Sequence, residues 1–170
     1  MMISFKEFAE HLERAIEQCG PQIEIGLAKV GEHTRTMAAE YFGREMSFWE
    51  PLSQATLKGF RHPYGFWIKG KEELGYSGHI SATDPLLRTG ATERSLAVAV
   101  EGLTMAVGSP SKIMLYQEMG THNSLTGNIP PRPVLGPAAM GSLPYAGEVF
   151  GEIAVALLTP GYLIRGGVKR

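Results

Sequence analysis

The 170-residue sequence contains few of the residues on which redox, metal and catalytic sites depend. It has one cysteine, Cys19, which excludes a disulfide within the chain and is compatible with a reducing compartment. Asp84 is the only aspartate, which leaves few carboxylates for a metal cluster. No HExxH pattern, nucleophile elbow or phosphate-binding glycine loop occurs. Paired zinc-ligand spacing is also missing from the five histidines, His11, His33, His62, His79 and His122. We therefore expect a protein without enzymatic activity, cofactor or metal.

Long apolar runs and a charge excess are missing too. The longest apolar stretch, residues 153–158, is far shorter than the roughly 20 residues that span a bilayer. Glutamates among the first twenty residues argue against a secretory signal. The net charge of −1 gives no bulk attraction to nucleic acid or to anionic membranes. Length and composition predict one soluble domain over residues 1–160, with a loose tail at 161–170.

Helical periodicity marks the first part of the chain. A capping box at Ser4 opens a pattern of apolar residues at helical spacing, which ends at Gly20-Pro21. A second helical pattern covers Ile23–Phe42, although Gly26 and Gly31 weaken its first half. These patterns predict either two helices or one long kinked helix. We favour two.

The second half of the chain predicts strands followed by helices. Residues 95–107 alternate in hydrophobicity around a Glu-Gly pair, which indicates a β-hairpin. A short helix at 113–119 and a longer one at 146–158 follow, and Ile113 and Tyr116 are expected to dock the short helix. We predict an α+β fold in which a hairpin-based antiparallel sheet packs against two or three helices, with the hairpin and the last helix forming the core.

Residues 43–87 lose this periodicity and are rich in glycine, proline and aromatic side chains. A long irregular loop inside a domain is usually functional or mobile, and its aromatic content is too high for a disordered linker. It is either a flap packed on its own chain or a subunit contact, because interfaces are enriched in aromatic residues. From this loop and from the polar loop at 122–128, the candidate interface residues are Trp49, Phe60, Tyr64, Phe66, Trp67, His122 and Asn123.

The segment Ile129–Val134 contains three prolines within four residues. Prolines fix φ and remove backbone donors, and Arg132 is pushed out of the α region by the proline that follows it. We expect an extended crossing to the last helix. Arg132 has two possible roles. In the first, it is a structural residue whose guanidinium donates to backbone carbonyls or to Glu118. In the second, it faces an interface or DNA. We favour the structural one.

Three stretches of the chain resemble elements of a protein family from tailed bacteriophages, and they occur in the same order along the sequence as in that family. Tyr116-Gln-Glu-Met-Gly-Thr121, followed by Ile129-Pro-Pro-Arg-Pro-Val-Leu-Gly-Pro137, resembles a signature of the HK97 gp10-like and Mu virion-morphogenesis proteins. Trp49-Glu-Pro-Leu-Ser53 and Pro85-Leu-Leu-Arg-Thr-Gly90 resemble elements upstream of that signature. Val134 stands where this family usually has phenylalanine. The resemblance implies a structural motif made of Tyr116, Glu118, Gly120, Thr121, Pro131, Arg132 and Pro133.

The resemblance also implies a function. Proteins of this type complete or terminate the tail and join it to the head, as α+β subunits in a ring that is commonly a hexamer, without catalysis or cofactor. The expected partners are copies of the same chain, the tail tube and head-connector proteins, with passing contact to DNA in the lumen and none to a membrane. The expected location is the virion neck, and the host cytoplasm during assembly. The alternatives are a head-side connector adaptor, a minor tail protein or, remotely, a small hydrolase using His62, His79 or His122.

Overall fold

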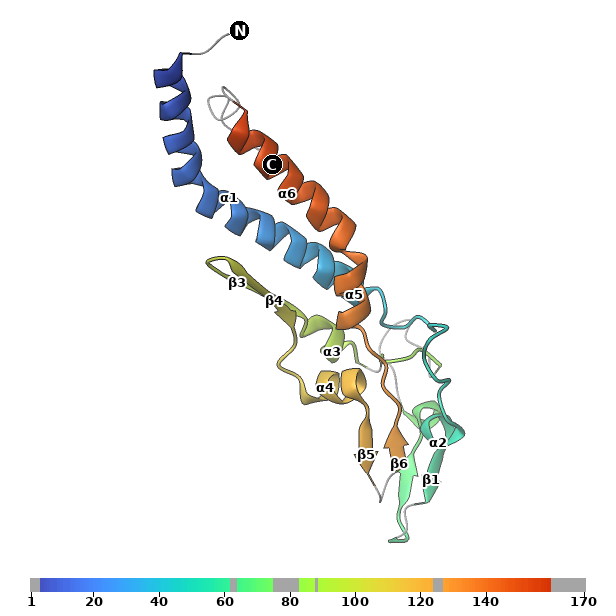
Figure 1. Cartoon of the computed structure of the whole chain (residues 1–170). Coiled ribbons are helices and arrows are strands. Elements are labelled where there is room, and N and C mark those ends of the chain that lie inside the picture. The colour runs from blue at the N-terminus through green and yellow to red at the C-terminus, as the bar shows by residue number, and fades with distance from the viewer. Residues whose placement is uncertain (1–3, 62–63, 75–82, 88, 124–126, 160–170) are drawn as a thin grey trace.

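The computed structural model describes residues 4–61, 64–74, 83–87, 89–123 and 127–159, which form an α+β chain. Figure 1 shows an elongated molecule with its longest helices at one end and two small hairpins at the other. Its strands pair in three antiparallel two-stranded units, β1–β2, β3–β4 and β5–β6. The elements are α1 (Phe5–Ala39), α2 (Gln54–Lys58), β1 (Gly59–Arg61), β2 (Trp67–Lys69), the 3-10 turn η1 (Lys71–Glu73), α3 (Ala91–Arg94), β3 (Ala97–Glu101), β4 (Thr104–Gly108), α4 (Lys112–Met119), β5 (Thr121–Asn123), β6 (Gly127–Ile129), α5 (Leu135–Gly141) and α6 (Leu143–Leu158).

The first helical region is one helix, α1, and the prediction of two helices is wrong. The capping box is present, since Ser4 N–H donates to Glu7 Oε2 at 2.7 Å and Glu7 N–H donates to Ser4 Oγ at 3.3 Å. The hydrogen bond from the Ser4 backbone N–H lowers the pKa of the Glu7 carboxyl. Pro21 lies inside the helix, and Figure 1 shows the first part of α1 at an angle to the rest. A proline in a helix interior removes one hydrogen bond and clashes with the preceding turn, and here it kinks α1 without ending it.

Two glycines let other elements approach α1 closely. A Cβ atom at Gly26 would lie 2.7 Å from Cδ1 of Ile153 on α6. A Cβ at Gly31 would lie 2.5 Å from Cγ1 of Val98 on β3 and 2.9 Å from Sδ of Met105 on β4. The glycines that weaken the helical pattern are therefore the positions at which α6 and the β3–β4 hairpin pack on the helix.

The β3–β4 hairpin confirms the prediction for residues 95–107. Glu101 pairs with Thr104 across a two-residue turn, and Gly102 has a positive φ of 55° that glycine adopts readily. The predicted core is corrected, however. The hairpin and α6 each pack on α1, which is the central element of the fold.

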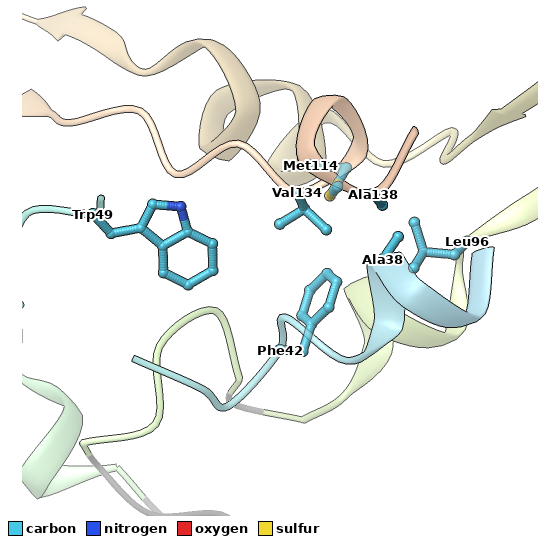
Figure 2. Packing of buried hydrophobic residues seen from close by; sticks show 7 residues of the cluster. All are labelled: Ala38, Phe42, Trp49, Leu96, Met114, Val134 and Ala138. Atoms are coloured by element: carbon cyan, nitrogen blue, oxygen red, sulfur yellow. The ribbon is translucent and has the colours of Figure 1, made fainter. Parts of the chain in front are cut away.

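The largest buried cluster lies at the C-terminal end of α1. Figure 2 shows Ala38 of α1 facing Ala138 of α5, with Phe42 and Val134 close by. Val134 is completely buried, so the smaller residue at this position of the motif is covered on all sides. The cluster consists of Ala38, Phe42, Trp49, Leu96, Met114, Val134 and Ala138.

The region predicted as one irregular loop, 43–87, contains short elements of its own. Ser53 caps α2, because its Oγ accepts from the N–H of Thr56 at 3.1 Å. Gly59 ends α2 with a φ of 85° and begins β1, which pairs with β2 through Phe60 and Ile68. Elements of three to five residues are too short to show periodicity. Only their cap and turn residues mark them in the sequence.

The short helix α4 is confirmed, but it docks by a face that was not predicted. Met114 is buried in the core cluster, whereas Ile113 and Tyr116 are exposed. The prediction that these two side chains dock the helix is therefore wrong. α4 has apolar residues on most of its circumference, so its hydrophobic pattern does not define a single buried face.

The segment after the prolines includes a helix that was not predicted. The chain is extended through Pro133, and α5 then begins at Leu135 with Pro137 in its first turn. A proline is tolerated there because that backbone N–H would have no partner within the helix. The predicted final helix is confirmed as α6, which begins three residues earlier than expected. The predicted tail, 161–170, lies outside the described residues.

The close packing on α1 makes a testable prediction about stability. The change Gly31→Ala should lower the free energy of unfolding by about 1–3 kcal/mol, because the steric conflict with the stiff Val98 side chain outweighs the gain in helix propensity. The control is Gly151→Ala on α6, where a Cβ meets nothing within 4 Å. It should raise stability by about 0.5–1 kcal/mol. Urea unfolding measures both, and equal effects of the two changes would contradict the packing role.

Candidate functional site

Arg132 joins three segments that are far apart in the sequence. Its buried guanidinium donates from Nη2 to the carbonyl oxygens of Glu50 at 2.9 Å and Pro51 at 3.4 Å. Its backbone N–H donates to the carbonyl of Gln117 on α4 at 2.6 Å. Burial lowers the pKa of the guanidinium, and the nearby Glu50 opposes that shift. The predicted fork onto backbone carbonyls is confirmed, while Glu118 is not a partner of this arginine.

Glu118 instead caps the N-terminus of α5. Its carboxylate oxygens accept hydrogen bonds from the backbone N–H groups of Val134, Leu135 and Gly136 at 2.8–3.2 Å. The first N–H groups of a helix have no partner within it, and a negative charge there is stabilised by the helix dipole. A residue of α4 therefore provides the cap that the residue preceding α5, Val134, cannot provide.

Gly120 and Thr121 make the turn that brings α4 back to the proline segment. Gly120 has a φ of 71°, and a Cβ there would lie 2.8 Å from the carbonyl oxygen of Ile129. Thr121 then pairs with Ile129 in the β5–β6 hairpin. Pro133 accepts a hydrogen bond from Nε1 of Trp49 at 3.3 Å. The arrangement is a rigid connection between α4, the proline segment and α5.

A cavity of about 390 Å³ adjoins Arg132. Lys71, Gln117 and several leucines also line it, and Gln117 Oε1 has no hydrogen-bond partner among the described residues. Burial lowers the pKa of the Lys71 ammonium, Asp84 opposes this shift, and Arg132 adds to it. The ammonium also donates to the carbonyl of Asp84. Among the lining residues there is no cysteine, histidine or carboxylate, so the cavity offers positive charge and hydrogen bonding rather than a nucleophile with its base.

The structure divides the predicted interface residues into three groups. Tyr64, Phe66 and Trp67 are exposed around the β1–β2 hairpin, so they are accessible as predicted. Trp49 is buried in the core cluster, where its indole packs near Tyr41 and Phe48, and its assignment as an interface residue is corrected. The backbones of Phe60, His122 and Asn123 lie in β1 and β5, but their side chains are outside the described part.

The residues of the predicted structural motif fall into two groups. Glu118, Gly120, Thr121, Arg132 and Pro133 meet in the connection described above. Pro131 is exposed beside them, and Tyr116 is exposed on α4. The histidines of the hydrolase alternative, His62, His79 and His122, have side chains outside the described residues.

Sequence reasoning missed one surface. The first part of α1 exposes an apolar stripe on a helix whose periodicity suggested burial, formed by Phe5, Phe8, Leu12 and Ile16. Periodicity identifies an apolar face but not what covers it, so no signal in the sequence separated this exposed stripe from a core face.

Within the described ranges, no group of three or more histidine, cysteine, aspartate or glutamate side chains is placed to hold a metal ion. No helix in those ranges combines the length and apolarity needed to cross a membrane.

Comparison with models of known protein families, with curated proteins and with solved structures finds no match.

The cap at α5 can be tested by the change Glu118→Gln. An amide has one acceptor oxygen and no charge, so we expect a loss of about 1–2 kcal/mol in the free energy of unfolding. The exposed Glu152 on α6 provides the control Glu152→Gln, for which we expect a change within about 0.5 kcal/mol. Equal losses in the two variants, measured by urea unfolding, would show that the cap is not a source of stability.

The partly buried Lys71 predicts a pH dependence. Its folded pKa is lowered relative to an unfolded value of about 10.4, so the unfolded chain binds more protons between those two pKa values. The free energy of unfolding of the wild type, relative to Lys71→Met, should therefore rise as the pH rises through that alkaline window. Urea titrations of both proteins from pH 8 to about pH 10.4 measure this difference. A difference that falls with pH would contradict the lowered pKa.

Proposed function

We propose that this chain is a structural subunit of a tailed-bacteriophage virion. It assembles as a ring at the head-proximal end of the tail, completes or terminates the tail, and joins it to the head connector. The single observation that carries the proposal is the set of large hydrophobic side chains that the described residues leave exposed.

The exposed surface of the described residues is apolar in the manner of an assembly subunit. The described residues include more exposed large hydrophobic side chains than buried core hydrophobic side chains. These exposed groups gather on the first part of α1, on α4 and around β1–β2. Contiguous apolar patches of this kind mark contact surfaces.

The resemblance to phage head–tail joining proteins supports the particular assembly. Its strongest segment, residues 116–137, includes the contacts of Glu118 and Arg132 that hold α4, the proline segment and α5 together. A rigid connection of this kind suits a subunit that keeps one shape while its outer surfaces contact neighbours. The motif therefore has a structural role that is consistent with the proposal.

The assembly can be tested with the purified chain. Light scattering after size exclusion should show an oligomer, and negative-stain electron microscopy should show rings. A chain that stays monomeric at high concentration, also in the presence of tail components, would overturn the proposal.

The role at the joint can be tested in the phage that encodes the chain. Deleting its gene should leave filled heads that are not joined to tails, or tails of abnormal length. Full heads beside finished tails point to the joining step, and overlong or missing tails point to termination. Normal virions from the deletion would contradict both roles.

A further inference from the structure

Two exposed surfaces at opposite ends of the molecule have opposite charge. The first, the helix surface, is the apolar stripe Phe5, Phe8, Leu12 and Ile16 of α1 together with Glu13 and Glu17. The second, the hairpin surface, surrounds the β1–β2 hairpin and consists of Arg61, Tyr64, Phe66, Trp67 and Lys69. Figure 1 shows the start of α1 and the β1–β2 hairpin at the two ends of the elongated chain.

The helix surface is apolar with an acidic margin. Residues 5, 8, 12 and 16 follow helical spacing and form one stripe, in which Phe5 is 87% and Ile16 is 75% exposed. Glu13 and Glu17 lie three residues before and one residue after Ile16, and both are exposed. Neither glutamate forms a salt bridge within the described part of the chain. This surface therefore presents hydrophobic area and unpaired negative charge together.

The hairpin surface is aromatic with a basic margin. Arg61 lies directly opposite Trp67 in the strand pairing, and Lys69 follows Trp67 by two residues, so the three side chains share one face. Tyr64 is 75% exposed, and Phe66 and Trp67 are exposed as well. Arg61 and Lys69 form no salt bridge among the described residues. Glu73 accepts a hydrogen bond from the indole N–H of Trp67 at 2.9 Å, so one carboxylate lies beside the two basic groups, and the net charge stays opposite to that of the helix surface.

We propose that the helix surface of one copy docks on the hairpin surface of the next copy. The proposal rests on the ring assembly proposed above and supplies its subunit contact. The apolar stripe covers the exposed aromatic residues, while Glu13 and Glu17 face Arg61 and Lys69 at the margin, where opposite charges select the partner and its register. Because the two surfaces differ and lie at opposite ends, the contact passes from copy to copy until the ring closes.

A basic face with aromatic side chains also suits single-stranded nucleic acid. The observations favour a second copy, because the chain itself carries an exposed surface of matching apolar character and opposite charge. The net charge of −1 gives no long-range attraction to a polyanion. The test below includes nucleic acid as an outcome.

The test uses two charge-reversed forms of the full chain. The helix variant carries Glu13→Lys and Glu17→Lys, and the hairpin variant carries Arg61→Glu and Lys69→Glu. Each variant alone places like charges across the contact. The concentration at which it assembles, measured by light scattering in low salt, should rise by about tenfold or more.

An equal mixture of the two variants should assemble again at close to the wild-type concentration. In an alternating arrangement, the basic helix surface of one variant meets the acidic hairpin surface of the other, and the remaining contact pairs the two unaltered surfaces. Such a ring closes only with an even number of subunits. The control is Glu101→Lys with Glu148→Lys, two exposed glutamates on β3 and α6 that give the same charge change as the helix variant and should leave assembly unaltered.

The outcomes separate this contact from the proposed function. A mixture that assembles no better than either variant alone, or a control as disruptive as the helix variant, would overturn the contact while wild-type rings still support the function. A wild type that never assembles would overturn the function itself. If the hairpin variant assembles normally but loses binding to a single-stranded oligonucleotide, the hairpin surface binds nucleic acid and the contact is wrong. Circular dichroism checks that every variant is folded.

Discussion

The close approach of two elements to α1 is the constraint on which the rest of the structure depends. Gly26 lets α6 reach the helix, and Gly31 lets the β3–β4 hairpin reach it. A glycine inside a helix costs about 1 kcal/mol relative to alanine, and here that cost is offset by the apolar contacts that the missing side chain permits. Both glycines lie after Pro21, so these contacts hold the second part of α1, and the proline bends the helix without ending it.

The connection around Arg132 applies the same principle to polar groups. Three prolines remove donors from the segment that crosses between α4 and α5, and few backbone bonds remain to position it. Arg132 and Glu118 supply the missing bonds, one by donating to carbonyls of a distant loop and the other by accepting from the start of a helix. Hydrogen bonds to charged groups are stronger than those between neutral groups, which suits a segment that has few of them.

These internal contacts leave much of the apolar surface outside the core. The buried cluster is small and lies at one end of α1, while the other end of the helix, α4 and the β1–β2 hairpin present apolar side chains outward. In the proposed ring, this surface is buried by association, and the hydrophobic effect acts between copies as it acts within one copy. Under the proposed contact, the opposite charges at the two ends of the molecule give that association a direction.

The sequence by itself determined the elements whose signals are local. The capping box at Ser4, the β3–β4 hairpin, α4 with its terminal Gly120 and the final helix all follow from spacing, caps and turn residues that act over a few positions. The structural fork of Arg132 onto backbone carbonyls was favoured from the sequence, but its burial was not.

Only the tertiary structure decided which apolar faces are covered. It buried Trp49 and Met114, exposed Ile113 and the stripe on α1, and carried α1 through Pro21. It also began α5 under the carboxylate of Glu118, a cap that lies sixteen residues before Val134 in the chain. Periodicity and turn chemistry describe one segment at a time. Burial depends instead on which segments meet, and contacts between distant residues set that.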